Sequence, residues 1–160
     1  MYEREKQQLI DCARAMERHG LVVLSGGNVS MRMPCGNFLV TPSAMSYDTM
    51  TIDDIVLMDG ETRTVEGRRR PTSDKHAVLY MFRHMPEVNV ILHTHQPYAT
   101  AVGLVSVRLP ANLVTVIDEL HGEVKVAPFT PSSDEGMGVS AVEYAGDALA
   151  VILKNHGVLG

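Results

Sequence analysis

The sequence has no tryptophan and only two cysteines, Cys12 and Cys35. Two cysteines in elements of different type do not make the disulfide framework of a small secreted domain, so we expect free thiols in a reducing cytosol. No apolar run is long enough to span a membrane, and no secretory signal opens the chain. These absences predict a cytoplasmic protein with no membrane partner.

An excess of positive charge is also missing, because 14 lysine and arginine residues face 19 acidic ones, for a net charge of −5. The one basic run, residues 68–70, is short and is expected in a solvated loop, so we predict no nucleic-acid partner. A glycine-rich dinucleotide fingerprint is absent, which argues against a doubly wound parallel sheet. At 160 residues the chain fits one domain, 1–160, and we expect a further strand and helix to follow Gly160.

Hydrophobic periodicity predicts alternating helices and many short strands. The expected helices are residues 3–19, 74–84, 98–104 and 140–145. The expected strands are residues 21–24, 29–33, 38–41, 55–58, 88–95, 113–117, 123–127 and 149–153, with an edge strand within 61–70. Hairpin signals dominate the first half, which favours an α/β or α+β domain with a largely antiparallel or mixed sheet.

The strand predicted at 88–95 ends on His93-Thr94-His95. Side chains alternate between the faces of a strand, so His93 and His95 project to the same side and can chelate one divalent ion. His156 follows another apolar run, and the ends of neighbouring strands can converge. Three imidazoles would leave an open position, as catalytic zinc requires. The alternative is that the pair makes only ordinary hydrogen bonds on a half-exposed strand.

Asp74 opens a predicted helix, where the helix dipole stabilises a carboxylate. A functional alternative places it beside the metal as a general acid/base or a transient ligand. Three turns rich in donors, residues 26–28, 41–43 and 72–73, could present N–H groups and hydroxyls to an anion. Ordinary turn chemistry explains any one of these turns alone.

Six motifs follow one another in a recognisable order: Ser-Gly-Gly-Asn-Val-Ser (25–30), Thr-Pro-Ser-Ala (41–44), Asp-Asp-Ile-Val (53–56), Pro-Thr-Ser-Asp (71–74), Pro-Glu-Val to Tyr-Ala-Thr around His-Thr-His (86–100) and Asn-His-Gly (155–157). Together they resemble the class II aldolase/adducin-type family, which includes L-fuculose-1-phosphate aldolase and L-ribulose-5-phosphate 4-epimerase. The resemblance covers nearly the whole chain.

The resemblance implies a three-layer α/β/α sandwich around a mainly antiparallel central sheet, assembled as a homotetramer with sites between subunits. It also implies one Zn²⁺ per subunit, held by His93, His95 and His156, with Asp74 as the catalytic acid/base. The residues that match the family's substrate-phosphate loops are Gly27, Asn28, Ser43, Ala44, Thr72 and Ser73. Ala44 stands where a glycine is common.

The activity implied first is a zinc-dependent aldolase that cleaves a small ketose phosphate through a metal-stabilised enediolate. Asp74 and a possible second acid/base, Asp118, instead favour the epimerase, whereas residues 96–100 look more like the aldolases. Asp118 is otherwise expected to be a strand-end residue. Two further alternatives are a sister aldolase, decarboxylase or dehydratase acting on a sugar acid phosphate, and a non-catalytic adducin-like module.

Overall fold

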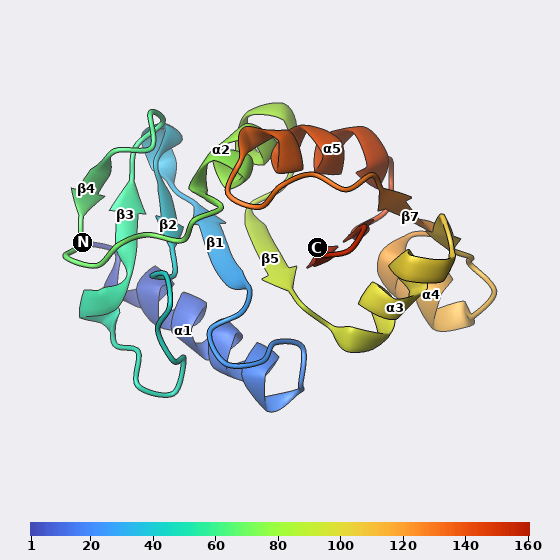
Figure 1. Ribbon diagram of the computed structural model, residues 1–160. Helices are drawn as coiled ribbons and strands as arrows, with labels where there is room; N and C mark the ends of the chain where they lie inside the picture. Colours follow the sequence, from blue (N-terminus) through green and yellow to red (C-terminus); the bar gives the residue numbers. More distant parts are fainter.

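A nine-stranded sheet forms the centre of the computed structural model, which describes residues 1–160 (Figure 1). The strands lie in the order β4-β3-β2-β1-β5-β9-β8-β7-β6, and every neighbouring pair is antiparallel except β7 and β8. Their bounds are β1 Asn28–Arg32, β2 Phe38–Val40, β3 Val56–Met58, β4 Thr64–Glu66, β5 Val90–Thr94, β6 Arg108–Leu109, β7 Val124–Ala127, β8 Val151–Leu153 and β9 Gly157–Leu159.

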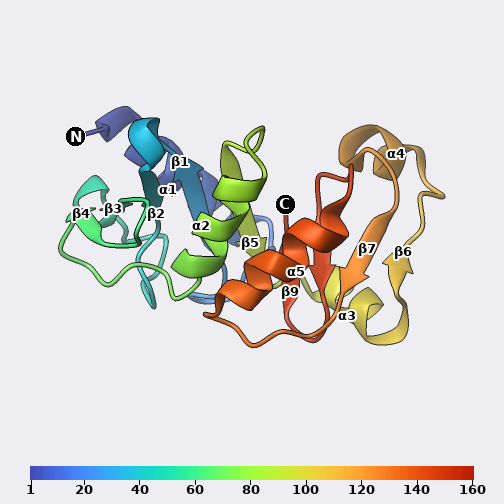
Figure 2. The same ribbon diagram turned by 90° about the horizontal axis from the view of Figure 1, so that it is seen from above.

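Helices cover both faces of this sheet. They are α1 Glu3–Arg18, α2 Lys75–His84, α3 Pro97–Val105, α4 Val114–Leu120 and α5 Glu135–Ala145, with short 3₁₀ turns η1 Pro34–Gly36 and η2 Ile52–Asp54. Figures 1 and 2 show α2 and α5 side by side on one face and α1 on the other. Along β8, Val151 and Leu153 belong to the core under α5, whereas Ile152 faces the cluster that includes residues of α3. The predicted three-layer α/β/α sandwich with a mainly antiparallel sheet is therefore confirmed.

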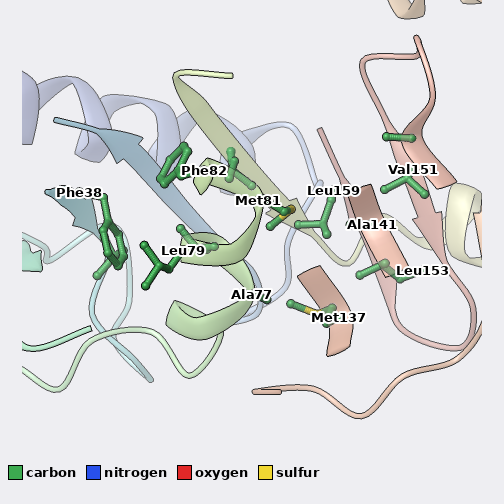
Figure 3. Close-up of a cluster of buried hydrophobic side chains, with 14 of the residues drawn as sticks. Phe38, Ala77, Leu79, Met81, Phe82, Met137, Ala141, Val151, Leu153 and Leu159 are labelled. Carbon is green, nitrogen blue, oxygen red and sulfur yellow. The ribbon is translucent and has the colours of Figure 1, made fainter. Parts of the chain in front are cut away.

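The largest apolar core lies between the α2–α5 pair and the sheet (Figure 3). Phe38 on β2 meets Phe82 on α2 edge to face, with ring centroids 6.1 Å apart. The two helices come close because α5 carries Gly138 where it crosses α2: a Cβ there would lie 2.9 Å from the Cα of Ala77. Figure 3 shows Ala77 and Met137 at this crossing.

Two predicted strands are wrong. Residues 21–24 form bends and a turn, with Val23 66% and Leu24 80% exposed. They cannot pair with the following strand, β1, because β2 and β5 already occupy both of its edges. Residues 113–117 begin helix α4, although their β-branched side chains favour a strand. In α4, Val116 and Leu120 are spaced by four residues and both pack towards the core, which is the helical period.

Helix α5 begins five residues before the predicted start at Ser140. Asp134 is its N-cap, and its side chain accepts a hydrogen bond from the N–H of Gly136. Two glycines in this stretch favoured a loop, but one of them, Gly138, is required for the contact with α2. The short strands β6 and β9 were not predicted.

Two simpler expectations can be compared with the structure. Both cysteines are free, as predicted, with Cys12 half-buried on α1 and Cys35 exposed. None of the helices combines the length and the apolar character that crossing a membrane demands.

We predict that Gly138→Ala lowers the free energy of unfolding by about 2 kcal/mol, because the added methyl group overpacks the α2–α5 crossing. Gly136→Ala is the matched control on the same helix, since a Cβ there meets nothing within 4 Å. Urea denaturation of the two variants measures the difference. Equal stabilities would contradict the close-packing account of α5.

Candidate functional site

His93 is the buried centre of the candidate site. It lies on β5 on the same face as Ile91, which belongs to the core under α2 and α5, and it is 1% exposed. Its Nδ1 is 3.1 Å from the carbonyl oxygen of Val158 on β9. Because a carbonyl only accepts, Nδ1 carries the proton, and Nε2 of the neutral ring keeps a free lone pair.

The other two histidines converge on that lone pair. His93 Nε2 lies 3.2 Å from His156 Nε2 and 3.2 Å from His95 Nε2. One ligand atom from each ring falls within 4.8 Å of the others. Nitrogens bound at 2.0–2.1 Å in tetrahedral zinc sites are separated by about 3.3 Å, so the separations from His93 to the other two rings suit a zinc-sized cation.

The hairpin between β8 and β9 delivers His156. Asn155 adopts a left-handed conformation with φ of 59°, which asparagine tolerates better than most residues. Gly157 then lets the hairpin approach β5, because a Cβ there would overlap the carbonyl oxygen of Thr94 and lie 3.1 Å from the His95 ring. Asn155 and Gly157 thus have local steric reasons for flanking His156.

Burial keeps His93 uncharged. Burial first, and then the neighbouring His156 and His95 rings, lower the pKa of His93 from 6.5 to about 4, although Asp74 and the bond to the Val158 carbonyl act in the opposite direction. The pKa of His156 is also lowered, mainly by burial and then by His95. Neutral imidazoles are the form that binds metal ions, so His93 and His156 are ready as ligands at neutral pH.

The three donor-rich turns are tied to one another by hydrogen bonds. Thr41 Oγ1 accepts from the N–H of Val29 at 3.2 Å, and its carbonyl accepts from the N–H of Thr72 at 3.1 Å. The N–H of Ser43 donates to the carbonyl of Arg70 at 2.9 Å. In or directly beside each turn, one N–H makes no hydrogen bond within the chain, namely those of Gly27, Ala44 and Ser73. Such free N–H groups can bind an anion.

Asp74 connects these turns to the histidines. It is 6% exposed at the N-cap of α2, and Asn28 donates from Nδ2 to its Oδ2 at 2.8 Å. Asn28 is the cross-strand partner of His93 in the β1–β5 ladder. The amide predicted to bind phosphate therefore also holds the carboxylate, and its Oδ1 is buried without a partner.

The remaining predicted residues, Ala44 and Asp118, form no hydrogen bond with the histidines or Asp74. Ala44 has a φ of 55°, a left-handed conformation that favours glycine. Asp118 is exposed on α4 rather than at a strand end, and it is not in the group formed by the three histidines. The Val158 carbonyl, which orients His93, had no sequence signal because any residue supplies such an oxygen.

Comparison with known proteins identifies the family. The family model described as Class II Aldolase and Adducin N-terminal domain matches residues 7–160, so the chain belongs to this family.

Among its relatives is L-ribulose-5-phosphate 4-epimerase UlaF of Salmonella paratyphi B, which is 35% identical over 123 residues, or 76% of this chain and 54% of the relative. A 5-deoxy-D-ribulose 1-phosphate aldolase of Bacillus thuringiensis is 28% identical over 161 aligned residues, or 99% of this chain and 75% of that aldolase. The matched region thus spans about half the length of the epimerase.

Solved structures share the fold. An L-fuculose 1-phosphate aldolase superposes with a TM-score of 0.90 at 29% identity, covering 97% of this chain and 73% of that one. The L-fuculose-1-phosphate aldolase of Thermus thermophilus gives a TM-score of 0.83 at 23% identity, covering 95% and 75%.

We predict that the metal-free protein loses stability as the pH falls from 6.5 to about 4. In this window His93 of the unfolded chain becomes protonated while the buried ring stays neutral, so the unfolded state binds more protons. His93 alone contributes up to about 3 kcal/mol. Denaturant unfolding at a series of pH values, in the presence of a chelator, measures the effect.

His93→Asn is the comparison variant, because it removes this titration and leaves every carboxylate in place. Its unfolding free energy should fall less steeply over the same window. Parallel curves for the two proteins would show that the buried ring does not titrate as described.

Proposed function

We propose that the protein is a zinc-dependent class II aldolase that cleaves a small ketose phosphate by retro-aldol chemistry. One observation carries the proposal: three converging imidazoles and three turns with free N–H groups are joined through Asn28 and Asp74. A ketose phosphate has oxygens for a metal at one end and a phosphate for the turns at the other. The site is thus complementary to both ends of this substrate class.

The residues of the chain have separable roles in this proposal. His93, His95 and His156 hold the ion, which would act as a Lewis acid on the developing negative charge of the ketose. Asp74, oriented by Asn28, moves the proton as general acid/base.

The remaining roles concern the phosphate. We propose that it is bound by the turns that contain Gly27, Asn28, Ser43, Ala44, Thr72 and Ser73, of which Thr72 and Ser73 precede α2 at its positive end. Fixing the phosphate would hold the reacting carbons in place.

A 4-epimerase is the second candidate, because the UlaF epimerases are 34–35% identical, and because the family resemblance matches Asp74 to the acid of that enzyme type. Both reactions can begin with the same carbon–carbon cleavage, and the epimerase rejoins the fragments on the opposite face of the aldehyde. Sister activities on a sugar acid phosphate use the same donors. A non-catalytic adducin-like module would not need three converging imidazoles.

The test is to incubate zinc-loaded protein with L-fuculose 1-phosphate and with L-ribulose 5-phosphate and to identify the products. The proposal expects free dihydroxyacetone phosphate from a ketose 1-phosphate, whereas conversion of L-ribulose 5-phosphate to xylulose 5-phosphate would identify the epimerase. His93→Ala should lose bound zinc and at least about 10³-fold in activity, because it removes the central ligand.

His76→Ala is the control for this variant, since His76 is exposed on α2 and belongs to no metal-capable group. It should keep both zinc and turnover. Full activity of zinc-free His93→Ala protein would refute metal catalysis.

We also propose a homotetramer, as the resemblance implied. Its support here is the exposure of large apolar side chains around α3, α4 and the segments beside them: Leu104, Val105, Val107, Leu113, Val114, Ile117 and Phe129. Asp118 lies on the same helix as some of these residues, and a subunit contact there would bring it towards another copy. Sedimentation as a monomer at micromolar concentration would contradict the assembly. A cytoplasmic location remains a prediction from the sequence.

A further inference from the structure

Tyr47 is the largest of the fully buried side chains, and it lies in the core beneath α1 rather than among the site residues. It is 1% exposed. Its hydroxyl donates a hydrogen bond of 2.8 Å to the carbonyl of Gly27 and lies 3.5 Å from the carbonyl of Gly26. Burial raises the pKa of this hydroxyl far above neutrality, so it is a permanent donor.

This contact orients the first donor turn. The C=O and N–H of a trans peptide point in opposite directions. The Gly27 carbonyl at 2.8 Å and the Gly26 carbonyl at 3.5 Å both face the Tyr47 hydroxyl, so the N–H of Gly27, which lies opposite the Gly26 carbonyl in their shared peptide, points away from that hydroxyl. That N–H is one of the three that make no hydrogen bond within the chain.

The opposite side of the turn rests against the histidine strand. Gly27 has a φ of 79°, and a Cβ there would overlap the backbone carbonyl oxygen of His93. A Cβ on Gly26 would lie 2.9 Å from His95 Nδ1. The turn is therefore held between the histidine strand and the Tyr47 hydroxyl, with no room for a rearranged backbone on the strand side.

Tyr47 is itself well anchored. Arg14 on α1 donates to three carbonyls of its loop, at 3.1 Å to Tyr47, 3.2 Å to Asp48 and 3.0 Å to Met50. Each of these bonds involves a charged donor, which makes it stronger than a neutral one. The hydroxyl is thus a fixed point for the turn above it.

We propose that Tyr47 is a positioning residue that holds residues 26 and 27 so that the Gly27 N–H faces the phosphate of the substrate. The proposal rests on the proposed function. Tyr47 acts through the backbone, so its hydroxyl governs phosphate affinity and leaves metal binding unchanged.

The test is Tyr47→Phe, which removes the hydroxyl and keeps the ring. Inorganic phosphate is titrated into the zinc-loaded protein, and the backbone amide signal of Gly27 is followed by NMR. Loss of one buried hydrogen bond predicts a dissociation constant about tenfold higher. Zinc stoichiometry stays the same, and with the sugar phosphate KM rises while kcat changes less.

Tyr80→Phe is the matched control, because Tyr80 is half-buried on α2, its ring stacks on His84, and its hydroxyl makes no hydrogen bond. It should bind phosphate as the wild type does. Arg14→Met is a second variant that loosens the anchor while the Tyr47 hydroxyl remains, and it should weaken phosphate binding several-fold.

The outcomes separate the two proposals. If the wild type shows no phosphate binding at the Gly27 amide, the phosphate site fails and this inference fails with it. If the wild type binds phosphate and Tyr47→Phe binds it equally well, only the inference is overturned. A lower melting temperature with unchanged phosphate affinity would give Tyr47 a purely structural role and would also overturn it. If Tyr47→Phe does not fold, wild-type affinity in Arg14→Met decides against the inference.

Discussion

The hydrogen bond between His93 Nδ1 and the Val158 carbonyl is the interaction on which the rest of the site depends. It fixes the tautomer of a fully buried imidazole and leaves Nε2 facing His95 and His156. Burial keeps the His93 ring neutral, and only a neutral imidazole can bind a cation. A solvated histidine would be partly protonated near its ordinary pKa of about 6.5. The bond exists because β5 and β9 are neighbours in the sheet, so the pairing of the strands determines the chemistry of the ring.

The same sheet brings the donor-rich turns to the histidines. Asn28 pairs with His93 across β1 and β5, and its amide reaches Asp74 at the start of α2. Asn28, the Asp74 carboxylate and the His93 ring are thus structurally connected. Core packing on both faces of the sheet holds these residues in place: α5 packs closely on α2 through Gly138, and Tyr47 supports the glycine turn from the α1 side.

Much of this could be predicted from the sequence, and the failures have physical causes. Strand alternation placed His93 and His95 on one side, and helix periodicity gave α1 and α2 with nearly correct bounds. Local preference failed at residues 113–117, where the burial of Val116 and the packing of Leu120 follow a helical period within a β-branched run. Local preference also failed at Gly138, because this glycine is needed for the close contact of α5 with α2, which is distant in sequence. The hydrogen bonds of the Val158 carbonyl to His93 and of the Tyr47 hydroxyl to Gly27 join residues far apart in sequence, so no local sequence pattern predicts them.

The central claim is that three imidazoles of one chain share a single cation, and X-ray absorption spectroscopy of zinc-loaded protein tests it most directly. The account predicts a tetrahedral zinc with three imidazole nitrogens at about 2.0–2.1 Å and one oxygen ligand. His156→Ala should reduce the imidazole count to two. A spectrum with one imidazole or none, or an imidazole count that His156→Ala leaves unchanged, would contradict the account.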